Sequence, residues 1–148
     1  MNFKEEMTAL ALRAKNASRQ MNRLSAAEKN DCLKAMADSI EANSGIIYEA
    51  NSEDIKIGLS MDLSQSMLDR LMLDQGRIMG MAQGLRDVAE LDDPTGNILN
   101  ERKRPSGLSL KKVSCPIGVI VMIYESRPNV TADSAGLCFK SGNAIILR

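Results

Sequence analysis

Residues 116–131, PIGVIVMIYESRPNVT, decide how the rest of the chain must be arranged. Residues 117–123 are apolar at every position, which is typical of a strand buried inside a parallel sheet. A polar turn follows, and Pro128 stands where a helix can begin, because the first helical residues need no backbone N–H. Gly142 marks the end of that helix through its backbone freedom. The apolar run 144–147 then predicts a second parallel strand beside the first.

The residues before this unit show a helical period. Apolar side chains recur at three-to-four spacing, first around Leu10 and again behind Asp74, which is typical of amphipathic helices. Ser25 and Glu28 form a capping box at the start of a second helix. The pattern predicts that residues 3–90 are mostly helical, with an interruption at 43–45 and a helix that Gly58 closes. The apolar stripe of the last helix is Ile78, Met81, Ala82, Leu85 and Val88.

Between the helices and the strand–helix–strand unit, the period changes to alternation. RPSG at 104–107 is a turn, and residues 108–113 alternate apolar with polar, which predicts a half-buried arm of an antiparallel hairpin. The chain therefore divides into helices over 1–95, a hairpin arm over 96–115 and a βαβ unit over 116–148. Its fold class is α/β. Because one βαβ unit buries too little surface, we expect a sheet truncated after its first unit.

Composition excludes several classes of protein. Nineteen basic residues balance nineteen acidic ones over 148 residues, so no global charge favours nucleic acid. No apolar run is long enough to span a membrane, and the first twenty residues do not resemble a signal peptide. The chain contains no histidine and three widely spaced cysteines, which argues against metal sites and disulfides. These features favour a reduced, cytoplasmic location.

The turn at 124–129 is the candidate site. Ligands of open α/β sheets bind at the carboxyl ends of the strands, and this turn follows such an end. Arg127 offers a planar fork for a carboxylate or phosphate, and the start of the next helix favours anions. The alternative is an ordinary strand–helix connection with a solvated arginine. The sequence has neither a GxGxxG loop nor a Walker lysine loop, so no standard phosphate-binding loop is indicated.

Two stretches, YESRPNVT at 124–131 and LCFKSGNAIILR at 137–148, resemble the γ-glutamyl phosphate reductase family, also called glutamate-5-semialdehyde dehydrogenase. Residues 50–55, 67–71, 77–88 and 104–108 are similar to the same family, so the resemblance covers nearly the whole chain. It extends over roughly the first third of the family's sequence. It implies the start of an aldehyde-dehydrogenase-type, Rossmann-like sheet.

For the complete enzyme, the resemblance implies the second reductive step of proline biosynthesis. NADPH gives a hydride to L-glutamyl 5-phosphate, which releases phosphate and leaves L-glutamate 5-semialdehyde. The resemblance also implies a homo-oligomer in which the hairpin arm joins a sheet between subunits. Nucleic acid and membrane are not expected partners.

The resemblance assigns the cofactor to the end of the first strand. Met122, Ile123, Tyr124 and Glu125 match superfamily positions that line the nicotinamide end of NADPH. Ser126 falls where aldehyde dehydrogenases commonly place an asparagine that holds the oxyanion, so it is the possible oxyanion position.

Three further polar residues have implied roles. Arg148 stands where the superfamily usually has a lysine that reaches the adenosine ribose or its 2′-phosphate. An arginine there suits NADPH, because a guanidinium can bind phosphate with two hydrogen bonds. Arg127 and Asn129 are the candidates for the substrate's carboxylate or phosphate.

The family's nucleophilic cysteine, whose thiolate displaces phosphate to form a thioester, lies outside the matched third. Cys32, Cys115 and Cys138 are predicted to be small buried hydrophobic residues. We therefore expect no catalytic residue, no metal and no activity in this chain alone. Three interpretations remain open: a truncated piece of the reductase, one half of a split enzyme completed by another polypeptide, and a non-catalytic helical interaction module.

Overall fold

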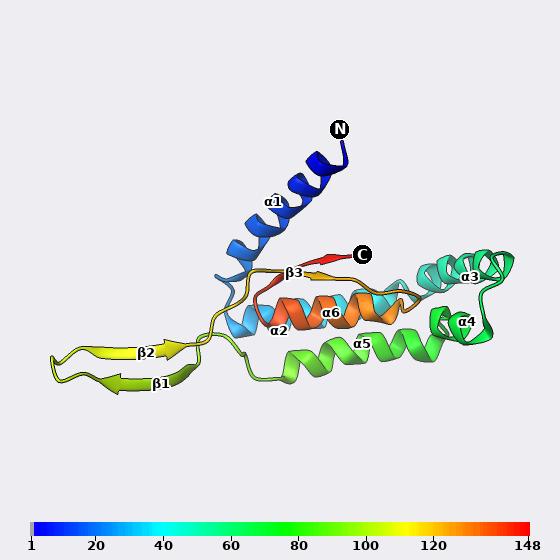
Figure 1. Cartoon of the computed structure of the whole chain (residues 1–148). Helices are drawn as coiled ribbons and strands as arrows, with labels where there is room; N and C mark the ends of the chain where they lie inside the picture. The colour runs from blue at the N-terminus through cyan, green and yellow to red at the C-terminus, as the bar shows by residue number, and fades with distance from the viewer. Residues whose placement is uncertain (1) are drawn as a thin grey trace.

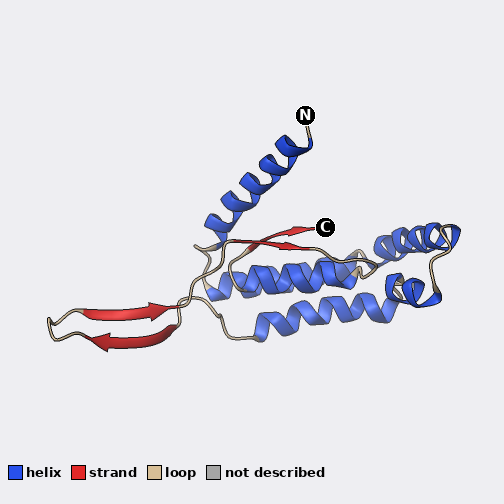
Figure 2. Cartoon of the chain, in the orientation of Figure 1, coloured by secondary structure: helices blue, strands red, loops and turns tan. Residues whose placement is uncertain are grey.

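The computed structural model describes residues 2–148, and its first part is helical as predicted. Within this described range, five helices precede the first strand: α1 (Phe3–Met21), α2 (Ala26–Ala42), α3 (Ser44–Ser60), α4 (Gln65–Leu71) and α5 (Gln75–Glu90). Strands β1 (Ile98–Lys103), β2 (Ser109–Val113) and β3 (Val119–Met122), helix α6 (Asn129–Lys140) and strand β4 (Ala144–Leu147) follow. Figures 1 and 2 show α2, α5 and α6 side by side, with α3 and α4 at one end of them, the hairpin β1–β2 extending from the other end, and α1 projecting away from this layer.

Local side chains set most of the helix boundaries. The predicted capping box is present at α2, where the Ser25 backbone N–H donates to Glu28 Oε2 at 2.8 Å and the Glu28 N–H donates to Ser25 Oγ at 3.3 Å. The predicted end of α3 at Gly58 is wrong, because the helix continues to Ser60. Gly58 is instead buried, and a Cβ there would stand 3.1 Å from side-chain atoms of both Leu63 and Leu68. The glycine therefore permits close packing of the α3–α4 turn.

The apolar core lies between α2, α5 and α6. The stripe predicted for α5 faces this core, with Ile78, Met81, Ala82 and Leu85 buried. Leu33 and Ala37 of α2 pack against it, and Phe139 of α6 covers its edge. Helices α5 and α6 approach closely at Gly136, where a Cβ would lie 2.6 Å from a methyl group of Leu85.

Strands β3 and β4 are adjacent and parallel, as predicted, with Val119 opposite Ala144 and Met122 opposite Leu147. Helix α6 connects them and packs along β4, which also contacts α1. Asn143 holds the start of the pair together, because its Oδ1 accepts a 2.7 Å hydrogen bond from the Gly118 N–H.

The first of these strands is shorter than residues 117–123, which the sequence predicts. Ile117 is 82% exposed and Ile123 is 78% exposed, and both lie outside β3. The residues of β3 itself are only half-buried, apart from Val121, which is exposed. Val121 is 60% exposed, so β3 is only partly covered within residues 2–148.

The hairpin is present, but the expectation that it is half-buried is wrong. Strands β1 and β2 pair antiparallel, with Glu101 opposite Lys111 and Arg102 opposite Leu110. Every residue of both strands is exposed. The alternation reflects the two faces of a ribbon, and within residues 2–148 neither face packs against another element.

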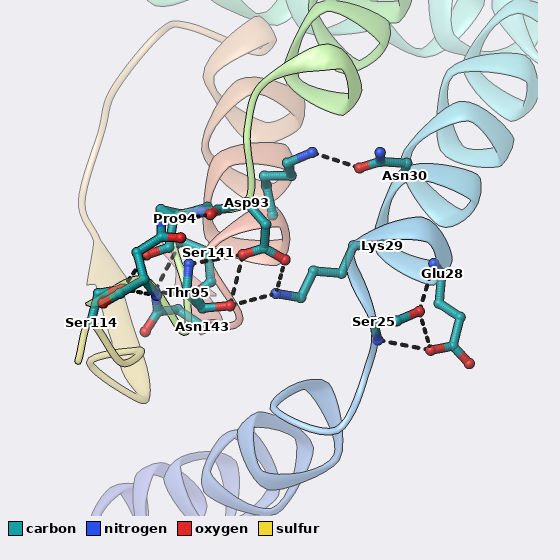
Figure 3. A network of polar contacts seen from close by, with 12 residues as sticks. Ser25, Glu28, Lys29, Asn30, Asp93, Pro94, Thr95, Ser114, Ser141 and Asn143 are labelled. Carbon is teal, nitrogen blue, oxygen red and sulfur yellow. Dashed lines mark hydrogen bonds and ion pairs between the residues drawn. The ribbon is translucent and has the colours of Figure 1, made fainter. Parts of the chain in front are cut away.

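Polar contacts fix the base of this hairpin to the helices (Figure 3). Lys29 of α2 is 2% exposed, and its Nζ donates to Asp93 Oδ2 at 2.8 Å and to Thr95 Oγ1 at 3.2 Å. Ser114 Oγ donates to the Pro94 carbonyl at 2.7 Å on the other side of the base. The arm therefore leaves the helices at a defined point. Among the described helices, none is long and apolar enough to cross a membrane.

Candidate functional site

The carboxyl ends of β3 and β4 bring three of the predicted residues together. The Tyr124 N–H donates to the Arg148 carbonyl at 2.9 Å, and the Arg148 N–H donates to the Met122 carbonyl at 3.0 Å. Ile123 and Glu125 are exposed beside them. Arg148 is exposed, and its guanidinium forms no ion pair with any residue in the described part of the chain.

The turn that follows β3 holds an unusual backbone conformation at Ser126. Its φ of 53° lies in the left-handed region, which costs free energy for any residue with a Cβ. The Tyr124 hydroxyl lies 2.5 Å from Thr131 Oγ1 and so ties the turn to the first turn of α6. Strained residues of this kind cluster at functional sites. The predicted oxyanion position is therefore the strained residue of this turn.

Arg127 and Asn129 line a hollow of about 430 Å³, which we name the Arg70–Arg127 hollow. Its walls come from α4, α5 and the beginning of α6. Arg148 is not among its lining residues, so the two predicted groups of polar residues occupy separate places. The hollow is lined by Asp69, Arg70, Met72, Leu73, Arg77, Gly80, Met81, Arg127, Asn129 and Asp133.

Some charges in this hollow are already paired within the protein. Arg77 donates to the Met72 carbonyl at 2.8 Å and to Asp69 Oδ1 at 3.0 Å, and it also donates to the Asp69 carbonyl. Asn129 Nδ2 donates to Asp133 Oδ2 at 3.1 Å. Arg70 and Arg127 make neither an ion pair nor a side-chain hydrogen bond with other residues of the described range 2–148.

Sequence reasoning did not find Arg70, Arg77 or Asp133 as site residues. Arg70 and Arg77 belong to stretches that resemble the reductase family, but nothing in their spacing assigns them a role. Arg77 joins Arg127 because α5 packs against α6. Arg70 comes with it, because Arg77 holds the end of α4 to the start of α5.

The cysteines are only partly where the sequence predicts. Cys138 is buried, and burial raises the pKa of its thiol, so it is a poor source of thiolate. The prediction is wrong for Cys32 and Cys115, which are exposed. Cys32 lies on a face of α2 that no other element covers within residues 2–148, and Cys115 lies in the loop before β3, at the end of the sheet opposite the site. No three His, Cys, Asp or Glu side chains gather as metal ligands in the described part of the chain.

Two parallel strands joined by a helix, with polar side chains at their carboxyl ends, define the α/β class of ligand-binding proteins. Comparison with known proteins then narrows this class. The chain is 49% identical over all 148 residues to the γ-glutamyl phosphate reductase of Clostridium novyi, and 49% identical over 148 residues to that of Geotalea daltonii. No protein-family model matches the chain.

Solved structures agree with the sequence comparison. The crystal structure of γ-glutamyl phosphate reductase from Thermotoga maritima matches 93% of this chain with a TM-score of 0.90 and 36% identity. The enzyme from Saccharomyces cerevisiae matches 95% of the chain with a TM-score of 0.89 and 39% identity. The similarity to this family that the sequence predicts is therefore confirmed.

The chain spans about a third of the proteins that it matches. It covers 36% and 35% of the two curated relatives, and 33% and 36% of the two solved chains. It corresponds to the N-terminal part of γ-glutamyl phosphate reductases.

Proposed function

We propose that this chain forms the N-terminal, cofactor-binding part of a γ-glutamyl phosphate reductase. The complete enzyme would be an oxidoreductase of proline biosynthesis that converts L-glutamyl 5-phosphate to L-glutamate 5-semialdehyde with NADPH. The observation that carries the proposal is 49% identity to curated reductases over the whole chain, together with TM-scores near 0.90. In this proposal residues 1–95 and 116–148 build the cofactor-binding part and residues 96–115 form the arm.

The residues at the strand ends fit a phosphorylated dinucleotide. The exposed, unpaired guanidinium of Arg148 suits a 2′-phosphate, which it can hold with two charge-assisted hydrogen bonds. Met122 to Glu125 stand beside it at the edge of the sheet, because β3 and β4 end in register. NADPH, when bound, supplies the hydride, and the residues of this chain bind and orient it.

The turn between β3 and α6 is proposed to face the reacting group. Ser126 is the possible oxyanion position, and its strained backbone conformation supports a functional role. Arg127 and Asn129, which line the hollow next to this turn, are proposed to hold the substrate's carboxylate or phosphate. None of the three cysteines is proposed as the nucleophile. Cys138 is buried with a raised pKa, Cys115 lies at the wrong end of the sheet, and Cys32 is on α2, outside the turn between β3 and α6.

We also propose that the working protein is a homo-oligomer in the cytoplasm. Apolar side chains on the arm support self-association, since Ile98, Leu99, Leu108, Leu110 and Val113 are all exposed. The half-covered strand β3, with its exposed Val121, supports completion by further polypeptide, whether in the same chain or as a separate partner in a split enzyme.

The proposal is tested with a chimera, in which this chain is followed by the part of the Clostridium novyi reductase beyond the matched segment. The chimera should form NADPH from NADP, phosphate and glutamate 5-semialdehyde, the reverse of the proposed reaction, whereas the 148-residue chain alone should not. Arg148→Gln in the chimera should raise KM for NADP by about tenfold, the loss expected for one charge-assisted contact, with a smaller effect on NAD. Equal effects on NAD and NADP would contradict the assignment of the 2′-phosphate to Arg148.

A further inference from the structure

Not every charged side chain of the Arg70–Arg127 hollow has a partner within the protein. Arg77 is satisfied by Asp69 and by two backbone carbonyls, so it fixes the end of α4 against the start of α5. Arg70 and Arg127 have no such partners among residues 2–148. The hollow therefore presents two unpaired guanidiniums, one from α4 and one from the turn before α6.

One carboxylate in the hollow also lacks a cationic partner. Asp133 accepts a hydrogen bond at Oδ2 from the neutral amide of Asn129, at 3.1 Å. Its Oδ1 faces α5 at Gly84, where a Cβ would stand 3.6 Å away. No ion pair to Asp133 exists within the described range of the chain. The hollow thus offers unpaired groups of both signs.

We propose that this hollow binds the zwitterionic head of an α-amino acid, with Arg70 and Arg127 on the α-carboxylate and Asp133 on the α-ammonium group. The inference rests on the proposed function, since the amino acid would be the L-glutamyl moiety of the substrate. A guanidinium fits a carboxylate with two parallel hydrogen bonds, and a carboxylate fits an ammonium ion. A phosphate group fits less well, because Asp133 would repel a dianion.

The remaining lining residues suit the rest of such a ligand. Met72, Leu73 and Met81 give an apolar surface for the two methylene groups of a glutamyl side chain. Ser126 directly precedes Arg127, and adjacent Cα atoms lie about 3.8 Å apart. The strained turn at Ser126 therefore adjoins the hollow, and the far end of a glutamyl group whose head lies in the hollow can point toward it. Arg70 and Asp133 are then specificity-determining residues.

The test uses binding by the 148-residue chain, so it does not depend on hydride transfer. L-Glutamate is titrated into labelled protein while amide and arginine side-chain resonances are followed by NMR. Glutarate, which lacks the ammonium group, and 4-aminobutyrate, which lacks the α-carboxylate, are titrated in parallel with inorganic phosphate. Glutamate should shift resonances of Arg70, Arg127 and Asp133, and the two truncated probes should bind about tenfold more weakly.

Variants test separately the residues proposed for the α-carboxylate and the residue proposed for the α-ammonium group. Arg70→Gln and Arg127→Gln should each weaken glutamate binding by about tenfold, whereas Asp133→Asn should weaken glutamate but leave glutarate unchanged. Arg104→Gln, in the exposed hairpin turn, is the matched control and should change nothing. Circular dichroism of each variant confirms that the helices are retained.

Three results would overturn the inference: phosphate competing with glutamate at these resonances, glutarate binding as tightly as glutamate, or no shift at the hollow at the highest soluble glutamate concentration. An active chimera with any of these results would leave the proposed reductase activity intact and reject the head site alone. Glutamate bound at the hollow beside an inactive chimera would reject the reductase activity and retain the site.

Discussion

The buried ion pair between Lys29 and Asp93 provides the sharpest test of how the hairpin is held. Its Nζ and Oδ2 atoms are 2.8 Å apart, and the two side chains are only 3% and 16% exposed. Asp93→Asn removes the negative charge while keeping the shape of the side chain. Lys29 is then a buried cation whose remaining partners are neutral oxygens.

The size of the effect follows from this burial. Removing one partner of a buried pair costs about 3–5 kcal/mol, and the amide oxygen of the new asparagine recovers part of this by accepting from Lys29. We expect Asp93→Asn to lower the free energy of unfolding by about 2–3 kcal/mol. Lys29→Met should cost less, about 1–2 kcal/mol, because Asp93 keeps its hydrogen bonds from the Thr95 N–H and hydroxyl at 2.9 and 2.7 Å.

The double variant is the decisive measurement. With both charges gone, no buried ion remains, so Lys29→Met with Asp93→Asn should be at least as stable as Asp93→Asn alone. Urea unfolding followed by far-ultraviolet circular dichroism gives all three values, and unchanged slopes confirm that stability alone has changed. The control is Lys34→Met, whose exposed pair with Glu90 contributes about 0–1 kcal/mol. Additive losses in the double variant, or equal losses for Asp93→Asn and Lys34→Met, would refute the reasoning.

Acid should weaken the same contact. Burial alone would raise the pKa of Asp93, but hydrogen bonds from Lys29 and Thr95 outweigh it and hold the pKa below its ordinary value. A carboxyl with a depressed folded-state pKa contributes stability that is complete above its unfolded pKa, roughly 4. This contribution is lost as the pH falls through the folded pKa. The acid-dependent loss should be smaller in Asp93→Asn.

Three other outcomes are expected. Gly142→Ala should lower the free energy of unfolding by about 1–2 kcal/mol in the same urea assay, because the φ of residue 142 is 71° and the new Cβ would lie 2.8 Å from Pro116. An unchanged free energy of unfolding would show that the turn before β4 can rearrange. Cys138→Ala in the chimera should keep its turnover within about twofold, and a loss matching that of a nucleophile would show that this thiol reacts. Leu110→Lys should reduce self-association of the chain, measured by sedimentation velocity at high concentration, because it places a charge on the exposed apolar arm. A parent chain that is monomeric under the same conditions would contradict self-association through the arm.

The helices and strands of this protein can be predicted from its sequence, because residues only a few positions apart determine them. Helix α2 begins where Ser25 and Glu28 satisfy each other's backbone groups, three residues apart. The parallel strands follow from continuous apolar runs, and the observed β4 has the predicted bounds. The family resemblance works in the same way, since it depends on short stretches such as YESRPNVT.

Alternation alone did not reveal which face of an element would be covered. Strand β2 has the alternating pattern of a half-buried strand, yet all its residues are exposed, because burial depends on what packs above it. The prediction that Cys32 is buried failed for the same reason, whereas Cys115 is exposed because it lies in the loop before β3. An apolar or small residue in a regular element is buried only when another element reaches that face.

Residues far apart in the chain meet only through packing. Lys29 and Asp93 are 64 positions apart, and no sequence rule pairs them; the packing of α2 on α5 brings them within 2.8 Å. The Arg70–Arg127 hollow arises similarly, from α5 lying against α6. The sequence thus determined where helices and strands form, since neighbouring residues decide this. The tertiary structure decided which charges are buried, paired or left available to a ligand, because electrostatic contacts depend on distance in space and on exclusion of water.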